Sequence, residues 1–293
     1  MIKPTVIIAS TQERSESAES ENLLLLAALT ERGVKARVEA WDAPEQVAGW
    51  STADLVTVRT TWDYTWRRDE FLAWAKHVDT VTVLQNPLAV MEWNSHKRYL
   101  VELARAGVPV VPTTLIPAGG PHDPLGPDPV VMKPAVAAGG RGAYLGPGHD
   151  LDGTLTDLLS QGDVLIQPVV ESIAAEGEIS LVKIGDTWSH AVRKIPAADG
   201  FLVQESHGGR LEGYEATPRE LEVAQSALAC SPAPVHAARV DLVRIAGEPV
   251  VMELELIEPD LFLRRSPREA DRLADALLPN LQEIGQRLPH RPR

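Results

Sequence analysis

The segment VVMKPAVAAGGRGAYL, residues 130–145, says the most about how this chain folds. Its apolar start predicts a strand that delivers Lys133, and a glycine-rich loop follows. Glycines let backbone N–H groups approach phosphate oxygens closely, while Lys and Arg neutralise the phosphate charge. The loop matches neither the Walker A motif nor the dinucleotide-binding G-x-G-x-x-G motif. It therefore predicts a different phosphate-binding loop, with a surface turn around a solvated lysine as the alternative. The loop residues are Gly139, Gly140, Arg141 and Gly142.

A second informative segment is VVMELELIEPDLFL, residues 250–263. In a strand, Glu253 and Glu255 point to one face, while the apolar residues between them point to the other. Asp241, in the preceding strand-like run AARVDLVRI, adds a third carboxylate. Hard oxygen ligands of this kind suit Mg²⁺ bound together with nucleotide phosphates. The alternative is an exposed acidic strand face, but the apolar flanks favour a buried sheet.

Two further segments carry polar residues that fit a nucleotide site. In residues 164–186, a strand runs into a proline-containing bend that could offer backbone groups to an adenine edge. Glu178 opens the next strand and could accept hydrogen bonds from ribose hydroxyls. In residues 190–210, Arg193 and Lys194 precede a glycine-rich flap, which fits a site for a transferring phosphoryl group. A loop between subdomains and a solvated charged face are the respective alternatives.

The composition restricts the classes of protein that the chain can be. A length of 293 residues fits one to three subdomains around a shared cleft. The net charge of −13, with no long basic run, excludes nucleic acid as an expected partner. Cys230 is the single cysteine, so there is no internal disulfide and no Cys-based metal site. Without a signal peptide or about 20 consecutive apolar residues, a cytoplasmic protein with no membrane contact is expected.

The hydrophobic pattern alternates strands and helices in the first third, which predicts a parallel sheet with helices on its faces. The remainder contains both kinds of element around an exposed Pro- and Gly-rich connection at residues 117–129. The predicted strands are 5–9, 34–40, 54–59, 81–84, 130–133, 164–167, 178–184, 187–194, 237–245 and 249–257. The predicted helices are 23–29, 71–78, 95–106, 151–159, 218–229 and 267–286.

Taken in order, these features resemble the ATP-grasp superfamily, in the branch that includes glutathione synthetase and the RimK-type ligases. The resemblance covers residues 95–263 and implies an α/β (α+β) fold. A Rossmann-like substrate domain (1–93) would precede a small ATP-grasp subdomain (94–168) and a C-terminal subdomain with the metal site (169–293). It implies ATP and Mg²⁺ as cofactors and assigns the nucleotide and metal residues. These are Lys97 and Lys133 for phosphates, Gln167, Pro168, Val169 and Val170 for adenine, Glu178 for ribose, and Asp241, Glu253 and Glu255 for magnesium.

The sequence is similar in more detail to the cyclo-ligases that close the ring of D-cycloserine, an antibiotic, from O-ureido-serine. The shared phrases include VRTTWDYTWRRDEF, EGEISLV, SHAVRKIPAADGFLVQESHGGR and ELELIEPDLFLR. The chain departs from these relatives at Leu202, where they carry Arg, and at Asp260, where they often carry Ser. Glu255 replaces an Asn found in many members of the wider superfamily. The first two positions lie near the expected substrate pocket.

The resemblance implies a carboxylate–nitrogen ligase. The carboxylate of a small amino-acid-like substrate would attack the γ-phosphate of ATP, and a nitrogen nucleophile would then displace phosphate from the acyl phosphate. Arg193 or Lys194 would stabilise the transferring group. Substrate residues are expected after the strand at 54–59, where open α/β sheets place ligands, and in the flap. They are Arg59, Thr61, Trp62, Asp63 and Tyr64, with His207, Gly208 and Gly209.

Three functional hypotheses follow for this chain. Ring closure within one molecule is favoured, and joining of two molecules by the same activation step is the alternative. A non-catalytic nucleotide-binding module is disfavoured, because such a module is expected to lose metal carboxylates that this chain keeps. An aromatic loop that merely packs against the next domain is the alternative for residues 58–64. A homodimer is the default expectation for the assembly.

Overall fold

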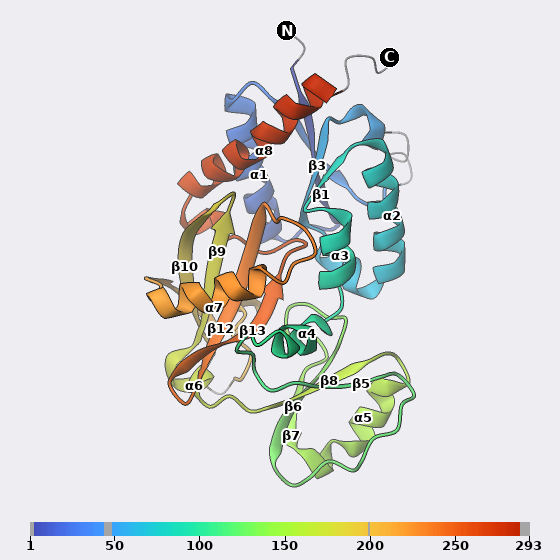
Figure 1. Ribbon diagram of the computed structural model, residues 1–293, viewed down its shortest axis with the longest axis vertical. Helices are drawn as coiled ribbons and strands as arrows, with labels where there is room; N and C mark the ends of the chain where they lie inside the picture. The colour runs from blue at the N-terminus through green and yellow to red at the C-terminus, as the bar shows by residue number, and fades with distance from the viewer. Residues whose placement is uncertain (1–2, 44–48, 199, 288–293) are drawn as a thin grey trace.

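A computed structural model describes residues 3–43, 49–198 and 200–287 of the chain. It contains three sheets, which follow one another along the sequence (Figure 1). The first is wholly parallel, with strand order β2-β1-β3-β4, and helices pack against its faces. Its strands are β1 (Thr5–Ser10), β2 (Lys35–Ala40), β3 (Leu55–Thr60) and β4 (Val83–Gln85). Its helices are α1 (Glu16–Glu31), α2 (Arg68–Val81) and α3 (Leu88–Asn94).

Helix α1 begins earlier than the predicted helix at residues 23–29. Its N-cap is Ser15, whose hydroxyl accepts a hydrogen bond from the backbone N–H of Ala18 at 3.2 Å. Glu16 and Glu19 lie in the first turn, where the positive end of the helix dipole stabilises carboxylates. Residues 16–22, which precede the predicted helix, therefore belong to its first turns. Gly33, with a φ of 76°, follows the helix end.

The second sheet is antiparallel, with strand order β5-β8-β6-β7, and helix α5 (Asp152–Leu159) packs against it. Met132, Leu155 and Val164 form its small separate core. Strands β5 and β7 are too short and too exposed to give a sequence signal, and both were missed. The strands are β5 (Thr114–Ile116), β6 (Pro129–Pro134), β7 (Tyr144–Pro147) and β8 (Val164–Pro168).

The third sheet is antiparallel, with strand order β11-β10-β9-β12-β13. Helix α7 (Pro218–Leu228) packs on one face, against the cluster that contains Leu181. Helix α8 (Arg268–Arg287) lies on the other, against the cluster that contains Val182. The strands are β9 (Glu178–Ile184), β10 (Thr187–Ile195), β11 (Arg210–Tyr214), β12 (Ala237–Ile245) and β13 (Glu248–Glu255).

Helix α8 also lies alongside α1, so the C-terminal helix returns to the N-terminal sheet (Figure 1). Arg32, the C-cap residue of α1, joins the two helices, with Nη1 2.7 Å from Asp271 and Nε 2.6 Å from Asp275. The short 3₁₀ helices are η2 (Trp50–Thr52), η3 (Trp62–Trp66), η4 (Gly148–Asp150), η5 (Glu205–His207) and η6 (Leu263–Arg265).

The helix predicted at residues 95–106 is shorter than expected. Residues 95–98 form a turn between α3 and α4 (Tyr99–Arg105). The backbone N–H of Lys97 donates to the carbonyl of Ala135 at 2.7 Å, so it is unavailable to a helical partner four residues earlier. This tertiary contact positions Lys97 beside the loop that follows β6. A second short helix, α6 (Ser172–Glu176), occupies the bend between β8 and β9 that sequence treated as irregular.

Candidate active site

One face of the third sheet concentrates charged side chains. Glu178 pairs with Lys194 across β9 and β10, and Asp241 pairs with both Ser180 and Glu253 across β9, β12 and β13. Cross-strand partners share a face, and so do alternate residues along a strand. The pairing therefore gathers residues from four strands at one place. They are Glu178, Ser180, Lys194, Arg239, Asp241, Glu253 and Glu255.

Asp241 is the centre of this face and is 2% exposed. Its Oδ1 accepts from the hydroxyl of Ser180 at 2.6 Å and from Nε of Arg239 at 2.9 Å. Its Oδ2 accepts from Nζ of Lys194 and from Nη2 of Arg239, both at 2.9 Å. Burial alone would raise the pKa of Asp241, but Arg239 and Lys194 hold it below the ordinary value. Asp241 is therefore an ionised carboxylate whose two oxygens are occupied by the protein.

Glu253 and Glu255 are more accessible than Asp241, with side chains 26% and 27% exposed. Glu253 forms an ion pair with Lys97, and Glu255 forms one with Arg239. Burial and the negative charges of Asp241 and Glu253 raise the pKa of Glu255 to about 8, although Arg239 opposes this. A further cation at this end of the face would relieve that repulsion.

Lys133 approaches the same group of charges from β6. Burial lowers its pKa to about 8, with Lys97 adding to the decrease and Glu253 and Glu178 opposing it. Among the described residues, the side chain of Lys133 has no ion-pair partner and no hydrogen-bond partner, although its backbone pairs with Leu165 in the sheet. Lys97 and Lys133 thus converge on Glu253, and the second of them is left without a carboxylate.

The glycine-rich loop after β6 contacts both the N-terminal unit and the flap. Arg141 donates from Nη2 to the hydroxyl of Thr65 at 2.6 Å, and its guanidinium carbon lies 4.5 Å from the centre of the Trp66 ring. On the other side, the ring Nε2 of His207 lies 3.3 Å from the carbonyl oxygen of Gly139. A Cβ at Gly140 would lie 2.9 Å from the Leu202 side chain, so that glycine permits close packing against the flap.

The flap itself depends on two glycines after η5. Gly208 has a φ of 82°, in the left-handed region that favours glycine. A Cβ at Gly209 would lie 2.2 Å from the carbonyl oxygen of Val203, so only glycine fits there. Leu202 packs against the glycine-rich loop and adds no charge to it.

The residues predicted to bind adenine and ribose lie where β8 leads through α6 into β9. The side chain of Gln167 donates to the hydroxyl of Thr113 at 2.8 Å, and the side chain of Val169 is partly exposed. Val170 is buried, and Pro168 ends β8. Glu178 is buried and forms an ion pair with Lys194, so its carboxylate is engaged within the protein in this structure.

The residues predicted after β3 contact different parts of the protein. Arg59 and Trp62 face the segment after β13: Arg59 Nη2 donates to the carbonyl of Pro259 at 2.9 Å, and Trp62 Nε1 donates to that of Glu258 at 3.2 Å. Asp63 instead accepts hydrogen bonds from Trp41 and Arg67. The remaining two are buried: Tyr64 packs with its ring centre 4.9 Å from that of Phe71, and the hydroxyl of Thr61 has no partner among the described residues.

Arg193 and Lys194 lie on opposite faces of β10. The guanidinium of Arg193 lies 4.8 Å from the centre of the Tyr214 ring and lines a separate hollow of about 320 Å³ with Glu176 and Arg244. The structure therefore brings Lys194 to the charged face and leaves Arg193 behind the sheet. Alternation along the strand separates the two residues, but the sequence could not tell which of them faces the carboxylates.

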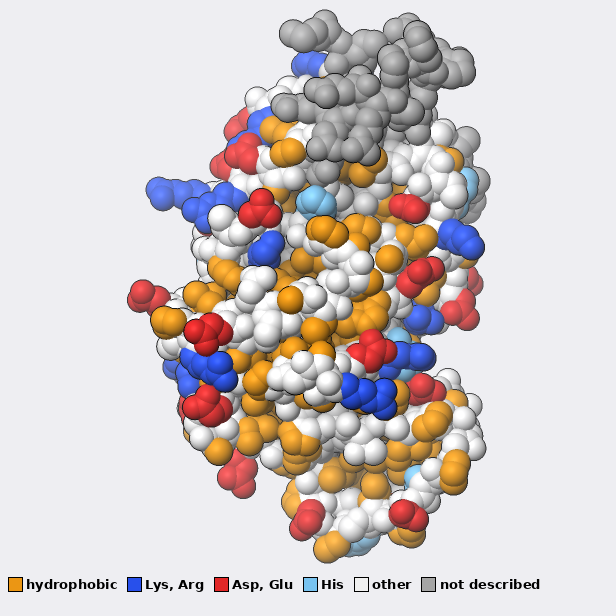
Figure 2. All heavy atoms as spheres, viewed as in Figure 1, with side chains coloured by type: hydrophobic (Ala, Val, Ile, Leu, Met, Phe, Trp, Pro, Cys, Tyr) orange, Lys and Arg blue, Asp and Glu red, His pale blue; other side chains and the backbone are white. Residues whose placement is uncertain are grey.

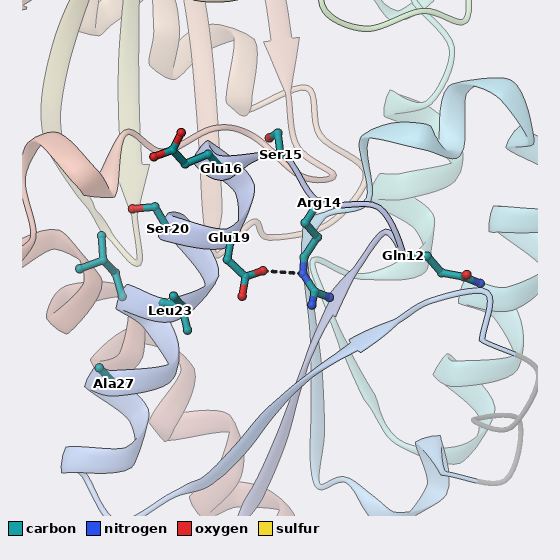
Figure 3. Close-up of a pocket in the computed structure, with 9 residues that line it drawn as sticks. Gln12, Arg14, Ser15, Glu16, Glu19, Ser20, Leu23 and Ala27 are labelled. Atoms are coloured by element: carbon teal, nitrogen blue, oxygen red, sulfur yellow. Dashed lines mark hydrogen bonds and ion pairs between the residues drawn. The ribbon is translucent and has the colours of Figure 1, made fainter.

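A larger hollow of about 820 Å³ lies elsewhere, along the first half of α1 (Figure 3). Arg14 and Glu19 point toward one another across it and form an ion pair of 2.6 Å. Its lining includes none of the sequence-predicted site residues. On the face shown in Figure 2, Lys and Arg side chains are interspersed with Asp and Glu and form no continuous basic patch.

Sequence reasoning missed Arg239, which contacts two of the three predicted metal carboxylates. Strand alternation was the available signal, because Arg239 lies two residues before Asp241 and must share its face. Magnesium suits the oxygen donors chemically, but within the described ranges no group of three or more His, Cys, Asp or Glu side chains is arranged to hold a metal ion. The cations already bound to the carboxylates explain this. Glu253 and Glu255 remain partly exposed beside their cations, whereas Asp241 is buried and both of its oxygens accept hydrogen bonds.

Comparison with known proteins places this site in a family. The family model for the N-terminal domain of the D-cycloserine synthetase DcsG matches residues 6–86. The cycloserine biosynthesis protein DcsG of Streptomyces lavendulae is 34% identical over 285 residues, which cover 88% of this chain and 93% of that protein. The chain belongs to the DcsG family of ATP-grasp ligases. The predicted family resemblance is therefore confirmed.

Solved structures agree with membership of the DcsG family. The crystal structure of D-cycloserine synthetase DcsG matches with a TM-score of 0.83 and 31% identity, over 94% of this chain and 99% of that one. The D-alanine–D-alanine ligase from Bacillus anthracis, complexed with ATP, matches with a TM-score of 0.73 over 97% and 99%. Its 16% identity shows a shared fold. The predicted ATP-grasp fold and carboxylate–nitrogen ligase class are confirmed.

The remaining predictions concern membrane contact, the division into units and the assembly of this DcsG-family chain. In the part of the chain that the structure describes, no helix is both long enough and apolar enough to cross a membrane. The division into units at residues 93 and 168 remains a prediction, as does the homodimer.

Proposed function

We propose that this enzyme uses ATP and Mg²⁺ to activate the carboxylate of a small amino-acid-like substrate as an acyl phosphate. The observation that carries the proposal is the convergence of Lys97 and Lys133 on Glu253, at one end of a buried charged face. Positive charges without a full complement of carboxylates suit the phosphates of ATP. Phosphoryl transfer requires mainly positioning and charge neutralisation, and these residues supply both.

Lys97 and Lys133 hold the phosphate groups in this proposal. Lys97 exchanges Glu253 for a phosphate oxygen when nucleotide enters, and that exchange leaves the carboxylate available for a metal. The backbone of the glycine-rich loop covers the phosphates, while Arg141 anchors the loop on Trp66. In this proposal the segment 167–170 receives adenine, and Glu178 binds the ribose.

Glu253 and Glu255 would hold magnesium, which would supply neutralisation of phosphate charge. Mg²⁺ usually takes one or two protein carboxylates and completes its shell with water and substrate phosphates, which fits two partly exposed carboxylates. Bound there, the ion supplies charge neutralisation and orientation of the phosphates. Asp241 serves a different purpose, because it keeps Arg239 and Lys194 ordered on the same face.

Lys194 stabilises the charge that develops during transfer. The substrate carboxylate oxygen forms a bond to the γ-phosphorus, and the bond from that phosphorus to ADP breaks. A substrate nitrogen then attacks the acyl carbon and loses a proton to solvent, while inorganic phosphate leaves with the electrons of the broken C–O bond. Arg193 is not needed in this scheme, because it lies behind the sheet.

Ring closure within one substrate molecule is the favoured form of the second step, because the related protein DcsG is a D-cycloserine synthetase. Joining of two molecules by an intermolecular attack is the alternative. ADP release with O-ureido-serine as the sole amino-acid substrate, and a product that has formed a ring, would support closure. ADP release that requires a second amine would support joining.

Variants separate the catalytic proposal from simple nucleotide binding. Glu253→Gln and Lys133→Ala are expected to reduce ATP turnover by at least a hundredfold, because each removes a charge beside the phosphates. Glu248→Gln, an exposed substitution on the same strand, serves as the matched control. Full ATP turnover in both site variants would overturn the proposed function.

A further inference from the structure

Glu258 is a buried acid that the mechanism above does not use. It follows β13 by three residues and is only 6% exposed. Its backbone is held in place, because its carbonyl accepts a hydrogen bond from Trp62 Nε1 at 3.2 Å. The next carbonyl, of Pro259, accepts from Arg59 at 2.9 Å. The segment is therefore fixed to the loop after β3, where open α/β sheets place their ligands.

The carboxylate of Glu258 has no partner from another residue. Within the described residues, no ion pair or hydrogen bond joins its oxygens to another side chain, and the hydrogen bond that acts on its carboxylate comes from its own backbone amide. Neighbouring acids are paired: Asp241 with Arg239, Glu253 with Lys97, and Asp260 with Arg264 at 3.0 Å. A buried carboxylate without a cation is unfavourable unless a ligand supplies one.

Charges from both parts of the proposed site act on the carboxylate of Glu258. They are those of Arg59, in β3, and of Arg239 and Glu253, on the charged face. Both arginines are engaged elsewhere, Arg59 with the carbonyl of Pro259 and Arg239 with carboxylates of the charged face. Burial raises the pKa of Glu258 to about 7, which Arg239 and Arg59 oppose. Burial is the main reason that the charged form of this carboxylate is unfavourable, so a cation brought by a ligand would stabilise it.

We propose that Glu258 binds the α-ammonium group of the substrate, so that the enzyme selects free amino acids over amine-blocked ones. This inference rests on the proposed function, because it positions the same molecule whose carboxylate is activated. Asp63, the residue predicted for this role, already accepts hydrogen bonds from Trp41 and Arg67 on its two carboxylate oxygens. A charge-assisted hydrogen bond from an ammonium group to Glu258 supplies the partner that the protein does not.

The test compares wild type with Glu258→Gln, which keeps the size of the side chain and removes its charge. The KM for O-ureido-serine should rise about 10- to 100-fold, the value of a hydrogen bond to a charged group. The KM for ATP and the half-saturating Mg²⁺ concentration should change less than twofold. Glu258→Asp keeps the charge and should recover part of the loss, and Glu248→Gln should match wild type.

A substrate analogue with hydrogen in place of the α-amino group completes a double-substitution cycle. For wild type, replacing O-ureido-serine by this analogue should raise KM about as much as the Glu258→Gln substitution does. For the Glu258→Gln variant, the analogue should raise KM little further. If the analogue raised KM by the same factor in wild type and in Glu258→Gln, the proposal would be overturned. A shift in Mg²⁺ dependence would also overturn it, because Glu258 would then bind metal. If Glu258→Gln does not fold, the Glu258→Asp cycle decides between the same outcomes.

Failure of this inference can be told apart from failure of the proposed function. If wild type forms no ADP with O-ureido-serine or any other free amino acid, the proposed function fails. If wild type turns over but Glu258→Gln discriminates against the analogue as wild type does, only the assignment of Glu258 fails.

Discussion

Replacement of Asp241 by Asn should destabilise the fold by about 3 kcal/mol. The carboxylate is 2% exposed and receives two hydrogen bonds from Arg239, one from Lys194 and one from Ser180. Removing one partner of a buried ion pair costs about 3–5 kcal/mol, because the other charge is left uncompensated. The lower end applies here, since Lys194 keeps Glu178 and Arg239 keeps Glu255.

The assay is urea unfolding at pH 7, with thermal unfolding as a second measurement. A loss of about 3 kcal/mol corresponds to a decrease in Tm of about 6 °C for a chain of this size. Asp275→Asn is the matched control, because Asp275 also pairs with an arginine but its side chain is 61% exposed. Exposed pairs contribute at most about 1 kcal/mol. An Asp241 variant no less stable than the Asp275 variant would refute the reasoning.

The same carboxylate predicts a pH dependence. Its pKa is held below the ordinary value in the folded protein by Arg239 and Lys194, so it binds fewer protons when folded than when unfolded. Its stabilisation is therefore present above the unfolded pKa of about 3.9 and is lost as the pH falls through the folded pKa. The stability difference between wild type and the Asn variant should shrink below about pH 4. A constant difference down to pH 3 would contradict this assignment.

Two further predictions concern the phosphate side of the site. Because burial lowers the pKa of Lys133 to about 8, ATP should bind more weakly as the pH rises above 8, by up to about tenfold per pH unit. Calorimetric titration between pH 7 and 9.5 checks this, and the step should disappear in Lys133→Arg; an identical profile in both proteins would contradict it. Trp66→Ala should raise the KM for ATP about 2- to 5-fold, because it removes the ring on which Arg141 lies. Its Tm should change little, since Trp66 is 68% exposed, and an unchanged KM, equal to that of the exposed control Leu23→Ala, would count against the loop anchor.

The sequence was sufficient for the features that depend on local periodicity. The alternation of apolar runs and helices gave the parallel sheet, and the two-residue period placed Glu253 and Glu255 on one face. The start of α1 was not predicted, because Ser15 caps the helix well before the predicted start at residue 23. The turn at residues 95–98 could not be read, because it depends on a hydrogen bond to Ala135, far away in the chain.

Features of the site that depend on strand register and on tertiary pairing could not be predicted from the sequence. One hydrogen bond to the carboxylate of Asp241 depends on the pairing of β12 with β9, because this pairing brings Ser180 opposite Asp241. That Lys194 faces the carboxylates follows from its pairing with Glu178. The sequence analysis assigned Asp63 to the substrate without considering Arg67. Arg67 lies four residues later and forms an ion pair with Asp63. In each case the residue type was informative, while its partner was set by the fold.

Transfer of oxygen from the substrate to phosphate tests the central claim most directly. O-ureido-serine labelled with ¹⁸O in its carboxylate would be incubated with the enzyme, ATP and Mg²⁺, and the nucleotide and phosphate products analysed by mass spectrometry. Activation as an acyl phosphate predicts ADP as the nucleotide product and one ¹⁸O atom in each inorganic phosphate released. Label in AMP, or inorganic phosphate that contains no ¹⁸O while product forms, would contradict the account.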